Sequence, residues 1–152
     1  MSKPVIGFAG MTHLGINSAA AAAGQGAETV CFDTDATVIG NLRSGKLSIE
    51  EPGLPELLEQ SKARMAYTAA AGDLKRCSVV YISADVPTDD QGQSDLSGIR
   101  ALIDTVAVGL ALDASLVILC QVPPGFTRSL SLPKERLYYQ VETLIFGRAV
   151  ER

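Results

Sequence analysis

The chain has 152 residues, of which 47% are hydrophobic, and it carries 13 basic against 17 acidic side chains, for a formal net charge of -4. That length suits one domain with a substantial core. No basic block is present, so the attraction that nucleic acid or an anionic membrane surface requires is missing, and we expect neither partner. No apolar run approaches the roughly 20 residues of a membrane-spanning helix, and no secretory signal is visible, so we expect a cytoplasmic protein.

The residues that most often bind metals or act as nucleophiles are few. Cys31, Cys77 and Cys120 lie in or beside apolar segments, which is typical of small buried hydrophobes rather than of disulfides or metal ligands. The single histidine, His13, excludes a multi-histidine metal site and leaves little room for a Ser-His-Asp triad. Any catalysis must therefore come from a cofactor or from carboxylates.

Short β-rich apolar runs alternate with helical segments along the chain. In chain order, the pattern predicts a strand at 5–9, a helix at 14–23, a strand at 29–32, helices at 36–42 and 54–62, strands at 65–68 and 79–83, a helix at 96–112, strands at 116–120 and 137–141, and a helix at 142–150. Such alternation implies right-handed crossovers. The predicted fold class is α/β, a Rossmann-like doubly wound, mainly parallel sheet of about six strands with helices on both faces.

A glycine-rich turn, Gly10-Met11-Thr12-His13-Leu14-Gly15, follows the first predicted strand and precedes an alanine-rich helix. These are the parts of a dinucleotide site, because unpaired helix amides and the positive end of the helix dipole face the pyrophosphate. Thr12 stands where the second glycine of G-x-G-x-x-G is expected, and a merely structural strand-to-helix turn is about as good an interpretation. We expect His13, at the tip of the turn, to be a solvated loop residue rather than a catalyst.

Asp33 ends the second predicted strand, 23 residues after Gly10. A carboxylate at this distance lies at the ribose of a bound adenosine, where both ribose hydroxyls can donate to it. The same carboxylate would repel a ribose phosphate, so NAD is favoured over NADP. The alternative is that Asp33 and Asp35 merely open the next helix; we expect Asp35 to do that and Asp33 to bind.

A segment further along the chain is far more specific than the glycine turn. Glu51-Pro52-Gly53-Leu54-Pro55-Glu56-Leu57-Leu58 resembles the E-P-G-L-x-E-L-L segment in the NAD-binding half of the UDP-glucose/GDP-mannose dehydrogenase family. Ala84-Asp85-Val86-Pro87 resembles the family's G-T-P loop, and Cys120-Gln121-Val122-Pro123-Pro124-Gly125-Phe126-Thr127 its S-T-V-P-V-G-T turn. Residues 142–150 are similar to its closing N-P-E-F-L-R-E-G-x-A-V segment. The resemblance covers nearly the whole chain and argues against a different NAD-linked hydroxyacid dehydrogenase.

The resemblance implies further site residues. Cofactor contacts would come from the glycine turn, from Asp33 and from two turns that follow strands, at Val86 and Pro87 and at Gln121 and Val122. Val86 and Gln121 replace turn threonines that contact the nicotinamide half of NAD in the family, and of these two only Gln121 can donate a side-chain hydrogen bond. Glu142 matches a glutamate that in the family assists general-base chemistry or positions water. The alternative is a surface glutamate at a helix start, and both interpretations stay open.

In this family an alcohol carbon of a nucleotide sugar is oxidised twice by NAD, through intermediates on a cysteine in the second half. Nothing here resembles that cysteine motif. The resemblance therefore implies one NAD-binding domain over residues 1–152, without the family's central helix and sugar-nucleotide-binding domain, and UDP-glucose as the first substrate to consider. We expect the chain to bind NAD without turnover, and any oligomer to form through missing parts. The alternative is a non-catalytic standalone module for NAD or another adenine nucleotide.

Overall fold

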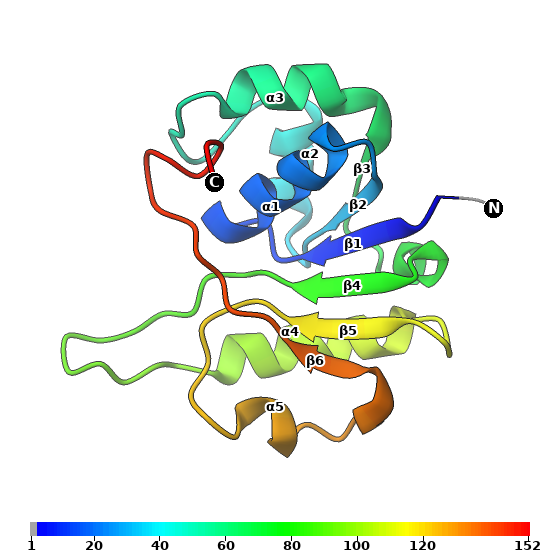
Figure 1. Cartoon of the computed structure of the whole chain (residues 1–152), viewed down its shortest axis with the longest axis vertical. Coiled ribbons are helices and arrows are strands. Elements are labelled where there is room, and N and C mark those ends of the chain that lie inside the picture. Colours follow the sequence, from blue (N-terminus) through cyan, green and yellow to red (C-terminus); the bar gives the residue numbers. More distant parts are fainter. Residues whose placement is uncertain (1–2) are drawn as a thin grey trace.

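The computed structural model describes residues 3–152. Within that range, six strands form one parallel sheet in the order β3-β2-β1-β4-β5-β6 (Figure 1). The strands are β1 (Val5–Ala9), β2 (Glu28–Phe32), β3 (Met65–Thr68), β4 (Val79–Ile82), β5 (Ser115–Ile118) and β6 (Leu137–Tyr139). The α-helices are α1 (His13–Gly24), α2 (Ala36–Arg43), α3 (Leu54–Ser61), α4 (Ser97–Gly109) and α5 (Phe126–Ser129).

The strand order places the start of the chain in the middle of the sheet. From β1 the chain moves outward to β2 and β3, and then returns to the other side of β1 to add β4, β5 and β6. Because all neighbours pair in parallel, every carboxyl end lies at one edge. Ligands of such sheets bind at that edge, where the winding direction changes, which here is between β1 and β4. The α/β prediction of a parallel, Rossmann-like sheet is confirmed.

Two apolar clusters cover the two faces of the sheet. On one face, α1 to α3 pack over strand residues that include Phe8 and Cys31. On the other face, α4 and a 3-10 helix at Ala71–Arg76 pack over residues that include Val80 and Ile118. Burial on both faces explains why the central strands are continuous apolar runs rather than alternating ones.

Helix α1 lies close to the sheet because its inner side is made of small residues. Ala19, Ala20 and Ala23 have no exposed surface. The helix ends at Gly24, and Gly26, with a φ of 95°, adopts the left-handed conformation that lets the chain turn back toward β2. The small residues of the sequence therefore set how near the amino end of α1 comes to the carboxyl edge.

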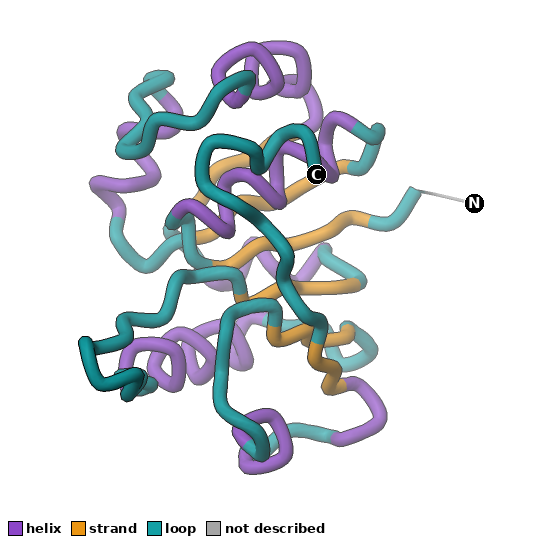
Figure 2. Tube along the Cα trace, turned by 60° about the vertical axis from the view of Figure 1, so that its left-hand side comes forward, coloured by secondary structure: helices purple, strands orange, loops and turns teal. Residues whose placement is uncertain are grey.

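The predicted helix over residues 142–150 is wrong. This part of the chain has no regular secondary structure; it leaves β6 as a loop and runs back beside α1 (Figures 1 and 2). Gly147 has a left-handed φ of 81°, and the backbone N–H groups of Gly147 and Ala149 donate to the side chain of Glu51 rather than to carbonyl oxygens one turn back. A tertiary contact thus replaces the helix. Residues 140–152 are called the closing segment below.

The three cysteines are free and buried. Removal from water raises the pKa of Cys31 to about 12 and that of Cys77 and Cys120 to about 11, so none is a thiolate at neutral pH. In the part of the chain that the structure describes, no helix has the length and apolar character to cross a bilayer, and no three potential metal ligands cluster.

Candidate cofactor site

The turn between β1 and α1 has room for glycine alone at its two ends. Gly10 has a φ of 97°, and a Cβ there would lie 2.4 Å from the Cβ of Ala84. A Cβ on Gly15 would lie 1.8 Å from the carbonyl oxygen of Gly10. The missing side chains therefore allow the first turn of α1 to pack directly on the end of β1 and on the chain that follows β4.

The amino end of α1 has no side-chain cap. Thr12 is the N-cap residue, yet its hydroxyl makes no capping bond, and the first turn contains no acidic residue. Instead the Thr12 Oγ accepts a hydrogen bond of 2.8 Å from the backbone N–H of Asp85. The amides of the first turn are consequently left without a side-chain acceptor, which is the condition under which a helix amino end binds an anion.

The Asp33 carboxylate lies beside this turn, just after β2. Its Oδ2 accepts a hydrogen bond from the backbone N–H of Met11 at 2.8 Å, and its Oδ1 accepts one from Asp35 at 2.9 Å. Each oxygen keeps a lone pair for a further donor. Asp35 caps α2 by accepting the N–H of Thr37 at 2.8 Å, so the helix-opening role predicted for Asp35 is confirmed.

A polar cleft of about 240 Å³ opens on the other side of the glycine turn, toward β4 and β5. Within it, Gln121 Nε2 donates to Glu142 Oε1 at 2.7 Å, and Glu142 Oε2 accepts the N–H of Leu144 at 2.9 Å. No helix begins at Glu142, so its interpretation as a helix-start glutamate is wrong. The cleft is lined by His13, Leu14, Ala84, Asp85, Val86, Gln121, Glu142, Leu144 and Phe146.

Two other predicted contact residues do not line this cleft. Pro87 is exposed, and its carbonyl accepts the N–H of Asp95 at 2.9 Å within the loop that follows β4. Val122 lines a separate hollow beside Tyr139. The cleft therefore brings together five predicted site residues, His13, Leu14, Val86, Gln121 and Glu142. Pro87 and Val122 lie outside it.

The expectation that His13 is solvated is wrong. Only 5% of its surface is exposed. Its Nε2 lies 2.8 Å from Oε2 of Glu51, and its ring stacks on Phe146 with 3.8 Å between ring centroids. A buried carboxylate close to the first turn of α1 accounts for the burial, because it supplies the partner that a buried imidazole needs.

Glu51 is the residue that the sequence interpretation missed. Its side chain has no exposed surface and accepts three hydrogen bonds, from His13 and from the backbone N–H groups of Gly147 (3.0 Å) and Ala149 (2.9 Å). The hydrogen bond from His13, followed by those of the two amides, holds the pKa of the Glu51 carboxyl below its ordinary value despite burial. The resemblance of Glu51 to Leu58 to a family segment singled out this residue. That local pattern could not predict hydrogen-bond partners about a hundred positions away.

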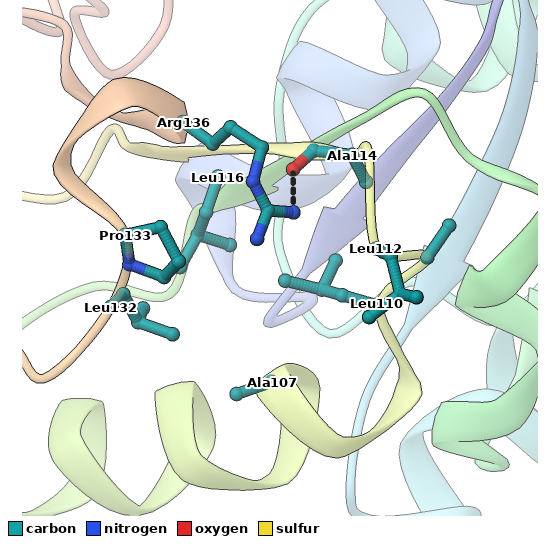
Figure 3. Close-up of a pocket in the computed structure, with 9 residues that line it drawn as sticks. Ala107, Leu110, Leu112, Ala114, Leu116, Leu132, Pro133 and Arg136 are labelled. Carbon is teal, nitrogen blue, oxygen red and sulfur yellow. Dashed lines mark hydrogen bonds between the residues drawn. The ribbon is translucent and has the colours of Figure 1, made fainter.

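A further hollow lies at the opposite edge of the sheet. It is bordered by Leu110, Leu116 and Pro133, and Arg136 closes one side by donating to the carbonyl of Ala114 at 3.2 Å (Figure 3). Its volume is about 100 Å³, less than half of the 240 Å³ of the cleft beside the glycine turn. It also lies at the amino end of β5, away from the carboxyl ends where ligands of such sheets bind.

The features of the carboxyl edge follow one another in strand order. Asp33 comes after β2, the glycine turn after β1, and the polar cleft opens beyond the ends of β4 and β5. An acidic group, an uncapped helix end and a cleft in this order define a Rossmann-type dinucleotide-binding domain.

Residues 5–142 match the model of the UDP-glucose/GDP-mannose dehydrogenase family, NAD binding domain. The chain belongs to this family.

Individual relatives agree with the family match. The chain is 30% identical over 119 residues to the UDP-glucose 6-dehydrogenase of Pseudomonas aeruginosa, covering 76% of this chain and 26% of that protein. It is 29% identical over 134 residues to the UDP-N-acetyl-D-mannosamine dehydrogenase of Pyrococcus horikoshii, covering 87% of this chain and 32% of that protein. The chain thus spans under a third of the length of these relatives.

Solved structures share the fold. The UDP-N-acetylmannosamine dehydrogenase of Pyrococcus horikoshii superposes with a TM-score of 0.87 at 25% identity, over 97% of this chain and 38% of that one. The GDP-mannose dehydrogenase of Pseudomonas aeruginosa, solved as a ternary complex, gives a TM-score of 0.84 at 22% identity, over 96% and 38% of the two chains.

Proposed function

We propose that this chain is the cofactor-binding part of a nucleotide-sugar 6-dehydrogenase, an enzyme that oxidises UDP-glucose or a related nucleotide sugar to the uronate with two NAD. The observation that carries the proposal is the Asp33 carboxylate, held beside the glycine turn with a free lone pair on each oxygen. The names of the relatives support the substrate class, since UDP-glucose 6-dehydrogenases recur among them.

The residues present fit NAD. Asp33 would accept the hydroxyls of the adenosine ribose, and its charge would disfavour NADP. The uncapped amides at the amino end of α1 would hold the pyrophosphate, in the space that Gly10 and Gly15 keep clear. Met11, Thr12, His13 and Leu14 complete this turn, and Val86 and Gln121 would border the nicotinamide half, with their chain neighbours Pro87 and Val122 outside the cleft. When bound, NAD supplies the acceptor for a hydride from the alcohol carbon of the sugar.

Glu142 is the carboxylate that we place nearest the reacting groups. Its two oxygens are oriented by Gln121 and by the backbone N–H of Leu144, and it faces the cleft beside Val86. A carboxylate held in this way can take a proton from an alcohol or orient a water molecule. We assign it that role in the complete enzyme.

The domain assignment follows the same proposal. Residues 1–152 would form one NAD-binding domain, with the sugar-nucleotide-binding part and the contacts of any oligomer supplied by other parts of the enzyme. The three cysteines of this chain are buried and protonated at neutral pH, so none can act as the nucleophile. The isolated chain would therefore bind NAD but not turn over a nucleotide sugar.

One observation favours a second function, a non-catalytic module that binds NAD or another adenine nucleotide. Val86 lines the cleft at a position where the family carries a threonine, and a valine cannot donate a hydrogen bond to the nicotinamide half. Such a module would keep adenosine recognition through Asp33 and need no sugar site. Comparing the affinities of NAD and ADP separates the dehydrogenase from a module for adenine nucleotides in general, because contacts to the nicotinamide half make NAD bind more tightly than ADP.

Calorimetric titration of the purified chain with NAD, NADP and UDP-glucose tests the proposal. We expect NAD to bind and NADP to bind at least about tenfold more weakly, since a hydrogen bond from the ribose to the charged Asp33 contributes roughly 1.5–3 kcal/mol. We expect UDP-glucose not to bind on its own. A chain that does not bind NAD contradicts the proposed cofactor function. Production of NADH from UDP-glucose at an enzyme-like rate contradicts the expectation that the isolated chain is inactive.

A further inference from the structure

We propose that Glu51 is a positioning residue for the nicotinamide side of the cofactor cleft, and that it acts by tying the closing segment to His13. The residues involved, His13, Glu51, Phe146, Gly147 and Ala149, are called the clasp. The inference rests on the proposed function, because it concerns how this chain shapes its NAD site.

The clasp joins three distant parts of the chain through one carboxylate. Glu51 Oε2 accepts from His13 Nε2 at 2.8 Å and from the Gly147 N–H at 3.0 Å, while Oε1 accepts from the Ala149 N–H at 2.9 Å. These partners are 38, 96 and 98 positions away from Glu51. The carboxylate is fully enclosed, so its charge is balanced by these donors rather than by water.

Each oxygen of Glu51 accepts a backbone N–H, and the lowered pKa of the carboxyl keeps it ionised at neutral pH. The two backbone groups can only donate, and the imidazole faces the same anionic oxygen, so His13 Nε2 must carry a proton. A glutamine at position 51 would offer one acceptor oxygen and would turn its NH₂ group toward a donor. An exchange of one oxygen for nitrogen therefore breaks at least one of the three bonds while leaving the size of the side chain unchanged.

The clasp fixes the position of His13 and Phe146, which form one wall of the cleft. Phe146 stacks on His13, with an interplanar angle of 23°, and both residues line the cleft with Glu142 and Leu144. Phe146 is 73% exposed, so burial alone does not hold its ring in place. The neighbouring bond from Gly147 to Glu51 fixes the backbone that carries this ring. Without Glu51, the backbone beside Phe146 loses this anchor, and the ring is no longer fixed over the cleft.

Packing beside the Glu51 carboxylate also holds the closing segment in place. Gly53 has a left-handed φ of 81°, and a Cβ there would stand 3.4 Å from Val150 of the closing segment. Leu54, the next residue, has no exposed surface. The chain that begins at Glu51 therefore meets the closing segment at a second point, between Gly53 and Val150.

The place of the clasp predicts a selective effect. Asp33 follows β2, on one side of the glycine turn, whereas the cleft that holds the clasp wall lies on the other side, beyond β4 and β5. Loss of the clasp should weaken contacts to the nicotinamide half and leave those to the adenosine half unchanged. A general loss of structure would weaken both equally.

The test compares the affinities of NAD and ADP for the whole chain by calorimetry, in Glu51→Gln and in the matched control Glu50→Gln. Glu50 is an exposed neighbour outside the clasp. We expect Glu51→Gln to lose about tenfold in NAD affinity with ADP affinity unchanged, and Glu50→Gln to match the parent chain for both ligands. Equal NAD affinity in the two variants, or equal losses of NAD and ADP affinity in Glu51→Gln, would overturn the proposal.

Three further substitutions, at Phe146 and at His13, keep the proposal open to refutation if Glu51→Gln does not fold. Phe146→Ala removes an exposed ring and leaves the Glu51 bonds in place, and we expect it to weaken NAD but not ADP. His13→Gln retains a neutral donor near the Nε2 position, whereas His13→Phe keeps the ring and removes the donor; we expect the first to bind NAD more tightly than the second. Unchanged NAD affinity in Phe146→Ala overturns the proposal. A parent chain that binds ADP but not NAD would refute the proposed function instead.

Discussion

The carboxylate of Asp33 accepts a hydrogen bond of 2.8 Å from the backbone N–H of Met11, 22 positions earlier in the chain. The bond joins the carboxyl end of β2 to the turn that begins α1, so the two parts of the adenosine-side site are held together before any ligand arrives. With the Asp35 N–H on its second oxygen, the carboxylate has one orientation. A ribose would meet acceptors that are already in place.

Asp33→Ala should abolish measurable NAD binding, because it removes both acceptors for the ribose hydroxyls. Two hydrogen bonds to a charged group, at roughly 1.5–3 kcal/mol each, correspond to a loss of at least about a hundredfold in affinity. Asp35→Ala is the matched control: it removes the cap of α2 and should cost about 1 kcal/mol in unfolding free energy while NAD affinity stays unchanged. Calorimetry and urea unfolding measure the two quantities. Retained NAD binding in Asp33→Ala would contradict the role of this carboxylate.

Gly15→Ala should destabilise the chain, because its Cβ would lie 1.8 Å from the carbonyl oxygen of Gly10 and α1 would have to move off β1. We expect a loss of about 3 kcal/mol or more in unfolding free energy. Gly40→Ala provides the contrast, since Gly40 lies within α2 with no atom within 4 Å of its Cβ position. That substitution should stabilise by about 0.5–1 kcal/mol. Urea unfolding measures the change in unfolding free energy of both variants. Changes of the same sign would refute the packing argument.

The contribution of Glu51 to stability should depend on pH. Hydrogen bonds from His13, Ala149 and Gly147 lower the pKa of Glu51 in the folded chain from an ordinary value of 4.5. Between the folded and the ordinary pKa the unfolded chain binds more protons, so the stabilisation is complete above pH 4.5 and is lost as the pH falls through the lower, folded value. The difference in unfolding free energy between the parent chain and Glu51→Gln should therefore be constant near neutrality and shrink in acid. A difference that grows on acidification would show the opposite sign of linkage.

The three thiols should resist modification in the folded chain. Burial raises the pKa of Cys31 to about 12 and of Cys77 and Cys120 to about 11, so the thiolate fraction at neutral pH is very small and access is blocked. A thiol-reactive disulfide reagent should label none of them quickly under native conditions and all three in guanidinium. Rapid labelling of the native chain would place at least one cysteine in an open environment.

The sheet was predictable because its strands are buried on both faces. Residues Val5–Ala9 and Met65–Thr68 lie where the apolar runs predict them, and β2 begins one residue early, at an exposed Glu28. Strand ends are harder, since Ile118 ends β5 two residues before the apolar run stops at Cys120. The residue at which a strand ends depends on its pairing with the neighbouring strand, and a local sequence pattern carries no information about that pairing.

The candidate site was predictable only where it depends on local geometry. The distance from Gly10 to Asp33 is set by one strand, one helix and a second strand, so the two ends come together in any such fold. Glu51 and Ala149 meet only through the tertiary structure, and helical composition in the closing segment gave the wrong prediction there. His13 was misjudged for the same reason, because its burial depends on Glu51.

The bond from the Asp85 N–H to the Thr12 hydroxyl has a thermodynamic consequence. It ties Thr12, in the middle of the glycine turn, to the loop that follows β4, across the point where the sheet changes its winding direction. Folding already restrains the motion of these two segments relative to each other. A dinucleotide that bridges them therefore does not lose binding free energy to ordering them. A threonine where a glycine is usual thus narrows the approach to the turn but makes its two sides rigid in advance.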